Sequence, residues 1–113
     1  MHVRIVHSQV PPEVITEATH IWQEQVAPGL KAQPGFVRTS LIGDSAGRAL
    51  AITVWHSEAD ALAYEASPLS GELVGLFTPY FASPPTMELF ELLGESSAMV
   101  IDGCALQETY EER

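Results

Sequence analysis

Lysine, arginine and cysteine are scarce in this chain, and long hydrophobic runs are absent. Five Lys and Arg residues stand against fifteen Asp and Glu residues, which gives a formal net charge of −10 over 113 residues. A surface this acidic repels the phosphates of nucleic acids and of anionic membranes, so we expect neither as a partner. No apolar run approaches the roughly 18 residues needed to cross a bilayer, so we expect no membrane-spanning helix.

The single cysteine, Cys104, excludes an internal disulfide bond. The N-terminal residues lack the apolar segment and the small-residue cleavage site of a secretory signal peptide. Both features favour a reducing compartment, and we expect a cytoplasmic protein.

The length suits one domain, which we place at residues 1–94. Residues 95–113 are predicted to form an acidic C-terminal tail that either packs on a partner subunit or is loose. Residues 99–101 allow a short fifth strand within this tail.

Period-two alternation and β-branched residues predict four strands, and spacings of three and four residues predict helices between them. The first helix should run from Glu13 to about Leu30, with a kink or fraying at Pro28 and Gly29, because proline lacks a backbone N–H. The predicted strands are residues 2–10, 36–43, 48–56 and 86–93, and the two later helices are residues 58–66 and 69–78.

Two short polar segments fix how these elements connect. Asp44 to Gly47 has turn chemistry, and so short a loop joins its strands as an antiparallel hairpin. Ser57, with Asp60 three residues later, suits the N-cap of the next helix. The order strand-helix-strand-strand-helix-strand predicts an α+β, ferredoxin-like fold with a four-stranded antiparallel sheet.

The hairpin strands carry apolar residues on both faces, whereas two helices cover only one face of such a sheet. The uncovered face would leave a larger apolar patch in water than monomers usually tolerate. We therefore expect a homodimer in which two sheets stack face to face.

Segments around the hairpin resemble the antibiotic biosynthesis monooxygenase-like superfamily of dimeric α+β barrels. The residues most like that family are Pro34-Gly35-Phe36, Trp55 at the end of a strand, and the capped acidic helix that follows, up to Ser67-Pro68. The resemblance covers about residues 3–93. It implies a cleft between the concave sheet and the helices of one subunit.

The family includes cofactor-independent oxygenases acting on aromatic polyketides and quinols, haem-degrading enzymes and isomerases. The resemblance therefore implies a small aromatic or quinol-type substrate and no cofactor. Tyr64 stands where many members have a histidine. The positions matching the Asn-Trp-His triad of the haem-degrading branch are His7, Tyr64 and Val74, so we do not expect haem degradation.

Two residues are candidates for chemistry. His7 has a side chain suited to removing a proton from a phenol or quinol, and Tyr64 can donate a hydrogen bond to a developing anion. The alternatives are a half-buried structural histidine and a packed helix tyrosine. Candidate substrate-binding residues are aromatic: Trp22, Trp55, Phe77, Tyr80 and Phe81. Trp22 and Trp55 also suit a structural role in the core, and Phe77, Tyr80 and Phe81 equally suit the core or the dimer interface.

Glu17 and His20 have the Glu-x-x-His spacing of bundle metal sites, but a second copy and further helices are missing. We read this pair as part of a solvated helix face and expect no metal site. A non-catalytic dimeric barrel that binds a small hydrophobic ligand or has a structural role is the main alternative to an oxygenase. An isomerase or lactone-rearranging enzyme is a third possibility.

Overall fold

In the computed structural model, which describes residues 1–96, four strands form one antiparallel sheet in the order β2-β3-β1-β4. The ferredoxin-like α+β prediction is confirmed, and the strand bounds agree with the predicted ones within two residues. The strands are β1 (His2–Gln9), β2 (Phe36–Gly43), β3 (Arg48–Trp55) and β4 (Thr86–Glu91).

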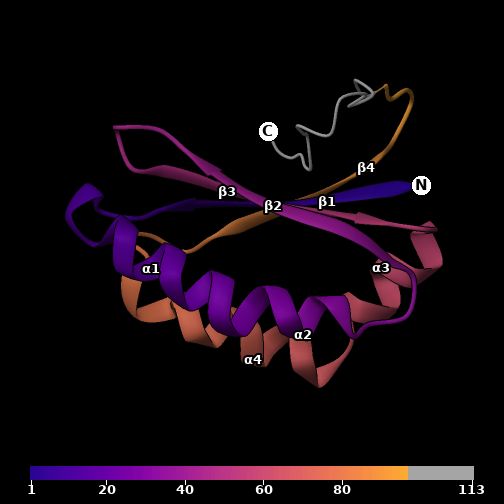
Figure 1. Ribbon diagram of the computed structural model, residues 1–113, viewed down its shortest axis with the longest axis horizontal. Helices are drawn as coiled ribbons and strands as arrows, with labels where there is room; N and C mark the ends of the chain where they lie inside the picture. The colour runs from indigo at the N-terminus through magenta and orange to yellow at the C-terminus, as the bar shows by residue number, and fades with distance from the viewer. Residues whose placement is uncertain (97–113) are drawn as a thin grey trace, which may run out of the picture.

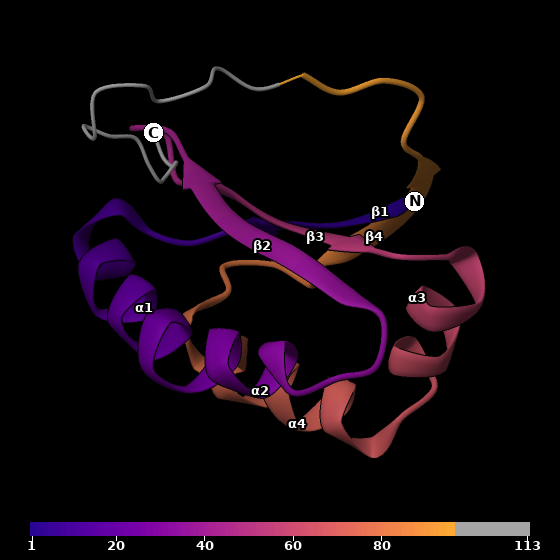
Figure 2. The same ribbon diagram turned by 45° about the vertical axis from the view of Figure 1, so that its right-hand side comes forward.

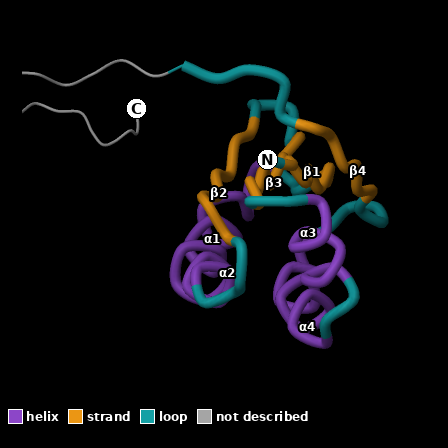
Figure 3. The backbone as a smooth tube through the Cα atoms, turned by 90° about the vertical axis from the view of Figure 1, so that its right-hand side faces the viewer, coloured by secondary structure: helices purple, strands orange, loops and turns teal. Residues whose placement is uncertain are grey.

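All described helices lie on one face of this sheet (Figures 1 and 3). The first helical segment is continuous from Pro12 to Lys31, and the second follows β3 and returns the chain to the sheet edge beside β1. Their parts are η1 (Pro12–Val14), α1 (Ile15–Ile21), η2 (Trp22–Val26), α2 (Ala27–Lys31), α3 (Glu58–Glu65), α4 (Pro68–Phe77) and η3 (Thr78–Tyr80). None of the described helices is long and apolar enough to cross a bilayer.

The first helix is disturbed one turn earlier than the sequence predicts. Trp22–Val26 is a π-helical turn, in which the N–H of Ala27 donates to the carbonyl of Trp22. An α-helix would press the ring of Pro28 against the carbonyl of Glu24, and a wider turn relieves that contact. The helix therefore continues through Pro28 as α2.

The two faces of the sheet differ in side-chain size. On the inner face, toward the helices, Arg4, Val6 and Ser8 of β1 pair with Thr53, Ala51 and Ala49 of β3. On the outer face, Val3, Ile5 and His7 pair with Val54, Ile52 and Leu50. The small residues of β3 thus face the helices, which leaves space between the two layers.

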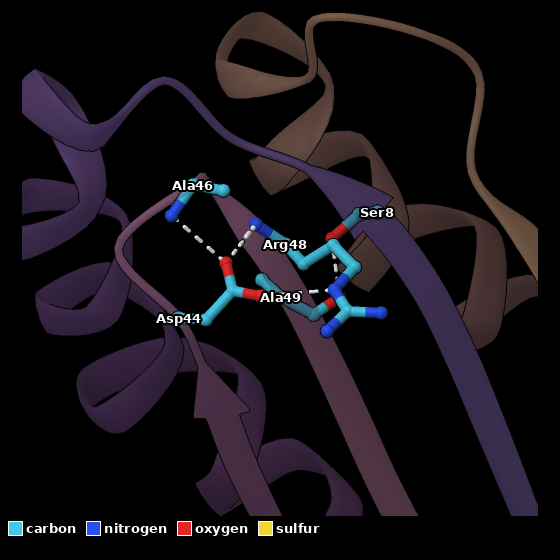
Figure 4. Close-up of polar contacts among 5 residues, drawn as sticks. All are labelled: Ser8, Asp44, Ala46, Arg48 and Ala49. Atoms are coloured by element: carbon cyan, nitrogen blue, oxygen red, sulfur yellow. Dashed lines mark hydrogen bonds and ion pairs between the residues drawn. The ribbon is translucent and has the colours of Figure 1, made fainter.

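The hairpin turn between β2 and β3 is held by Asp44 (Figure 4). Its Oδ1 accepts the backbone N–H groups of Ala46 and Arg48, each at 3.0 Å, and its Oδ2 accepts Nε of Arg48 at 2.9 Å. The Arg48 hydrogen bonds hold the pKa of this carboxyl below its usual value. Beside the turn, Ser8 Oγ donates to the carbonyl of Ala49 and ties β1 to β3.

Replacing Gly47 with alanine is expected to lower the free energy of unfolding by about 1–3 kcal/mol. Gly47 has φ +93, and an added Cβ would stand 2.6 Å from the carbonyl oxygen of Val10. The matched control is Gly75→Ala in α4, where a Cβ meets nothing within 4 Å. That change should be neutral or stabilising, since alanine favours helix. Urea denaturation measures both, and equal effects would contradict the prediction.

The core is centred on Trp55, which is 0% exposed. Its ring stacks on Tyr64 with centroids 5.0 Å apart and meets the edge of Phe36 at 6.1 Å. The N-cap predicted for α3 is confirmed, because the N–H of Asp60 donates to Ser57 Oγ at 3.1 Å. This cap starts α3 at the end of β3, which brings Tyr64 over Trp55.

Beyond β4 the chain turns back above the outer face of the sheet (Figure 2). The N–H of Leu92 donates to the carbonyl of Met1 at 2.9 Å, and Glu95 forms an ion pair with Arg38 of β2. The predicted tail contacts, the short strand at residues 99–101 and Cys104 lie outside the described residues.

Candidate active site

A cavity of about 60 Å³ lies between the inner face of the sheet and the helices. Its wall is mainly aliphatic and aromatic, and residues of α1, η2, α2, α3 and α4 provide the side away from the sheet. The lining residues are Arg4, Val6, Ser8, Val10, Ile15, Ala18, Trp22, Val26, Leu30, Leu41, Ala49, Ala51, Thr53, Tyr64, Leu73, Val74, Phe77 and Phe81. A mostly apolar wall with a few polar groups is typical of a small-molecule site.

The polar groups in the wall fall into two sets. Ser8 donates to a backbone carbonyl, and Thr53 is hydrogen-bonded to Thr39 at 3.1 Å, so both hydroxyls are engaged within the sheet. By contrast, Nε of Arg4 and Nε1 of Trp22 are buried without a hydrogen-bond partner among the described residues. Buried donors are normally paired, so these two N–H groups are unsatisfied within the described residues of the cavity wall.

Arg4 and Tyr64 lie together in the wall. The guanidinium carbon of Arg4 stands 5.4 Å from the centroid of the Tyr64 ring, within the range of a cation–π interaction. Burial raises the pKa of Tyr64, and the positive charge of Arg4 only partly opposes this. Tyr64 is therefore a neutral hydroxyl at neutral pH, fitted to donate a hydrogen bond.

Glu65, which follows Tyr64 in α3, lies next to Arg4. Its Oε2 lies 3.7 Å from Nε of Arg4, which makes an ion pair but not a hydrogen bond. The side chains of Arg4 and Glu65 are 12% and 30% exposed. Glu65 does not line the cavity, so among the described lining residues Arg4 is the only charged one.

The structure brings four of the predicted site residues together. Tyr64, Trp22, Phe77 and Phe81 all line the cavity, and the rings of Phe77 and Phe81 stack with centroids 6.1 Å apart. The other three, Trp55, Tyr80 and His7, lie elsewhere. Trp55 is fully buried behind Tyr64, outside the lining.

Tyr80 also lies outside the lining. Its hydroxyl donates to Glu17 Oε2 at 2.6 Å, and this hydrogen bond raises the pKa of Tyr80. His20 pairs with Glu24 at 2.8 Å on an exposed helix face. Within residues 1–96, no three His, Cys, Asp or Glu side chains converge on a possible metal position.

His7 lies on the opposite face of the sheet from Tyr64. Its Nε2 stands 2.8 Å from Glu88 Oε1, beside an open surface depression, and it is absent from the cavity wall. A molecule bound against Tyr64 in this cavity is therefore separated from His7 by the sheet itself. The structure does not unite the two residues that the sequence suggested for catalysis.

Arg4 and Glu65 are the site residues that the sequence reasoning missed. One available signal was strand β3, whose small residues, Ala49 and Ala51, share a face with Trp55 and leave room beside it. The residues of β1 that pair with this face of β3 include Arg4 and not His7.

Residues 1–75 match the family model described as antibiotic biosynthesis monooxygenase. The chain belongs to this family. No curated protein matches the chain by sequence.

Solved structures of low sequence identity share the fold of this family member. A monooxygenase from the gene ActVA-Orf6 of Streptomyces coelicolor, in complex with nanaomycin D, has a TM-score of 0.73 at 19% identity, covering 87% of this chain and 92% of that one. The heme-degrader MhuD of Mycobacterium tuberculosis, with two hemes bound, has a TM-score of 0.71 at 20% identity, covering 86% and 100%. SnoaB, a cofactor-independent oxygenase from Streptomyces nogalater, has a TM-score of 0.63 at 19% identity, covering 83% and 95%.

The cavity of this family member does not fit haem. Among residues 1–96 its wall contains no histidine, cysteine or methionine, and the one remaining type of iron ligand there is the Tyr64 hydroxyl. The raised pKa of Tyr64 disfavours the tyrosinate that would bind iron. We therefore derive no chemistry through haem.

Proposed function

We propose that this chain is a cofactor-independent monooxygenase that acts on a small aromatic phenol or quinol. The observation that carries the proposal is the apolar cavity, which is walled by Trp22, Phe77 and Phe81 and is also lined by two residues with hydrogen-bond donors, Tyr64 and Arg4. Flat aromatic side chains suit a planar substrate, and donors in an apolar wall suit an oxygen that becomes negatively charged.

The size of the cavity supports a small substrate. Ligand pockets usually hold roughly 300–1,000 Å³, whereas this cavity measures about 60 Å³. Binding must therefore move wall side chains apart, and each additional ring requires more movement. A compound of one to three fused rings is the expected range.

The proposed reaction needs electrons from the substrate itself. For an anthrone, loss of a proton gives an anion that transfers electrons to O2. One oxygen atom then becomes the new carbonyl of a quinone, and the other leaves as water with the two hydrogens of the oxidised CH2 group. The described part of the wall holds no carboxylate or histidine, so in this proposal the first proton passes to solvent water while Tyr64 donates to the substrate oxygen.

Oxygen uptake with a panel of anthrones and naphthohydroquinones, in the presence of a chelator and without added cofactor, tests this proposal. Turnover should transfer one atom of 18O2 into the product. Tyr64→Phe is expected to lower kcat about 10–100-fold, because one donor to the anion is lost. The matched control is Tyr80→Phe, which removes a hydroxyl outside the cavity and should leave the rate unchanged. Equal rates in Tyr64→Phe and the wild type would contradict the role of Tyr64.

A non-catalytic barrel that binds a small hydrophobic ligand is the second candidate function. The absence of a side-chain base from the described cavity wall favours it. Saturable binding of the same compounds without oxygen uptake across the panel would select this alternative.

The proposed assembly is a homodimer joined through the outer face of the sheet. No described helix covers this face (Figure 3). Ile5, Leu50 and Ile52 lie near its middle, and Ile42 and Phe90, toward its edges, are 49% and 45% exposed. A second copy of the same face would bury these side chains and remove an apolar patch from water.

A further inference from the structure

We infer that Arg4 is the anion-binding residue of the cavity, and that the natural ligand is an aromatic compound carrying a negatively charged oxygen. This inference rests on the proposed function for the place where substrate binds, and it adds the charge of the substrate. The shared chemistry is an aryl-bound anionic oxygen, either a fixed carboxylate or a phenol that ionises in the site.

The first argument is the position of the charge. Arg4 is central on the inner face of β1, opposite Thr53 of β3 and Leu89 of β4. A guanidinium here is surrounded by the core rather than by water, and its side chain is only 12% exposed. Burying a charge is costly unless it is paired, so an arginine in this place indicates a partner of opposite charge.

The second argument is that the partner within the chain is incomplete. Glu65 approaches Nε at 3.7 Å, outside hydrogen-bonding distance, and both Arg4 Nε and Glu65 Oε2 are buried without a hydrogen bond among the described residues. Glu65 partly offsets the cost of burying Arg4 but does not satisfy its donors. An arginine has five N–H donors in a planar fork that matches a carboxylate, and Nε is the one that approaches Glu65, so an anionic ligand can accept hydrogen bonds from the other donors of the fork.

The third argument is the chemistry of the residues that line the wall together with Arg4. The guanidinium stands over the ring of Tyr64, whose hydroxyl is a neutral donor, and Nε1 of Trp22 is a further unpaired donor. Within the described wall no negatively charged side chain reaches the cavity to compete with a ligand. The wall therefore combines one positive charge, neutral donors and aromatic surface, which together select an aromatic anion over a neutral aromatic compound.

Binding of two matched, unreactive probes tests the inference without relying on turnover. The probes are 2-naphthoate, which is anionic, and 2-naphthalenemethanol, which has similar size and no charge. The wild type should bind 2-naphthoate about tenfold more tightly, because hydrogen bonds to a charged group are the stronger ones. Isothermal titration at pH 7 and low ionic strength measures both affinities, and thermal melting checks the fold of each variant.

Arg4→Gln should reduce this preference to within about twofold while the affinity for 2-naphthalenemethanol is retained. Arg4→Lys should keep part of the preference, because a lysine retains charge but not the planar fork. Arg38→Gln is the matched control: it removes the same charge from an exposed residue of β2, and the preference should persist.

A second arm uses 2-naphthol, whose absorbance reports ionisation. If the site ionises a phenol, the pKa of bound 2-naphthol should fall by about one unit or more in the wild type and not in Arg4→Gln. Preference for 2-naphthoate alone identifies a fixed carboxylate, and a lowered naphthol pKa identifies an ionised phenol; either supports the inference. A wild type that shows neither effect, or an Arg4→Gln variant that keeps both, overturns it. Because no reaction is involved, a failure here is distinct from a lack of oxygenase activity.

Discussion

Replacing Trp55 with alanine is expected to lower the free energy of unfolding by about 3–5 kcal/mol. Trp55 is the one large side chain that is fully buried among the described residues, and it lies between Tyr64 and Phe36. Its removal takes away both ring contacts and leaves a cavity that β3 cannot close. A domain of this size has roughly 5–15 kcal/mol of stability in total, so a large share of it would be lost.

The matched control is Trp22→Ala, which removes the same side chain from a half-buried position beside an existing cavity. Its cost should be smaller, because less packing is lost there. Urea denaturation followed by far-ultraviolet circular dichroism compares the two variants without depending on tryptophan fluorescence. A larger loss of stability in Trp22→Ala than in Trp55→Ala would contradict this account of the core.

Local signals explain why most of the fold could be predicted from the sequence. The turn at Asp44 to Gly47 depends on hydrogen bonds within five residues, and the cap at Ser57 depends on a contact three residues away. Such interactions are set by neighbouring residue types, so the pattern alone indicates them. The π-helical turn at Trp22–Val26 was not predicted, because it reflects how a whole helix adapts to Pro28.

The sequence does not determine which face of β1 points toward the helices. Both faces of this strand carry apolar residues, so alternation predicts a strand but does not say which set points toward the helices. Val3 and Ile5 made the face of His7 the more apolar one, yet it is the outer face. Successive residues of a strand point to opposite faces. The face of β1 that points toward the helices therefore decides whether His7 or Arg4 is the charged or titratable group beside a ligand.

The candidate site was therefore predicted only in part. Tyr64, Trp22, Phe77 and Phe81 line the cavity. Trp22 was suggested by helix spacing, Tyr64 by the family resemblance, and the two phenylalanines by the cluster of aromatic residues near the end of the last helix. Arg4 was missed, because an arginine in a strand usually reaches solvent. Its burial depends on α3 and on Glu65, about sixty residues away, and only the folded chain brings these groups together.

Replacing Ile52 with aspartate is expected to separate the proposed dimer into monomers. Ile52 lies on central strand β3 and pairs with Ile5 and Ser40, so its side chain stands near the middle of the outer face. In a two-fold symmetric interface each substitution occurs twice, and two carboxylates would be buried without a partner. Because an uncompensated buried charge costs about 3–5 kcal/mol, the dissociation constant should rise about a thousandfold or more.

The matched control is Leu62→Asp, which places the same charge on α3, on the helix side of the sheet, where Leu62 is 47% exposed. Size-exclusion chromatography with light scattering at micromolar concentration should give twice the chain mass of 12.3 kDa for the wild type and for Leu62→Asp. Ile52→Asp should give the single-chain mass with an unchanged circular dichroism spectrum. A monomeric wild type, or a dimeric Ile52→Asp variant, would show that the outer face is not the interface. Since the cavity is built within one subunit, a folded Ile52→Asp monomer should still bind 2-naphthoate through Arg4, so assembly and ligand binding can be separated experimentally.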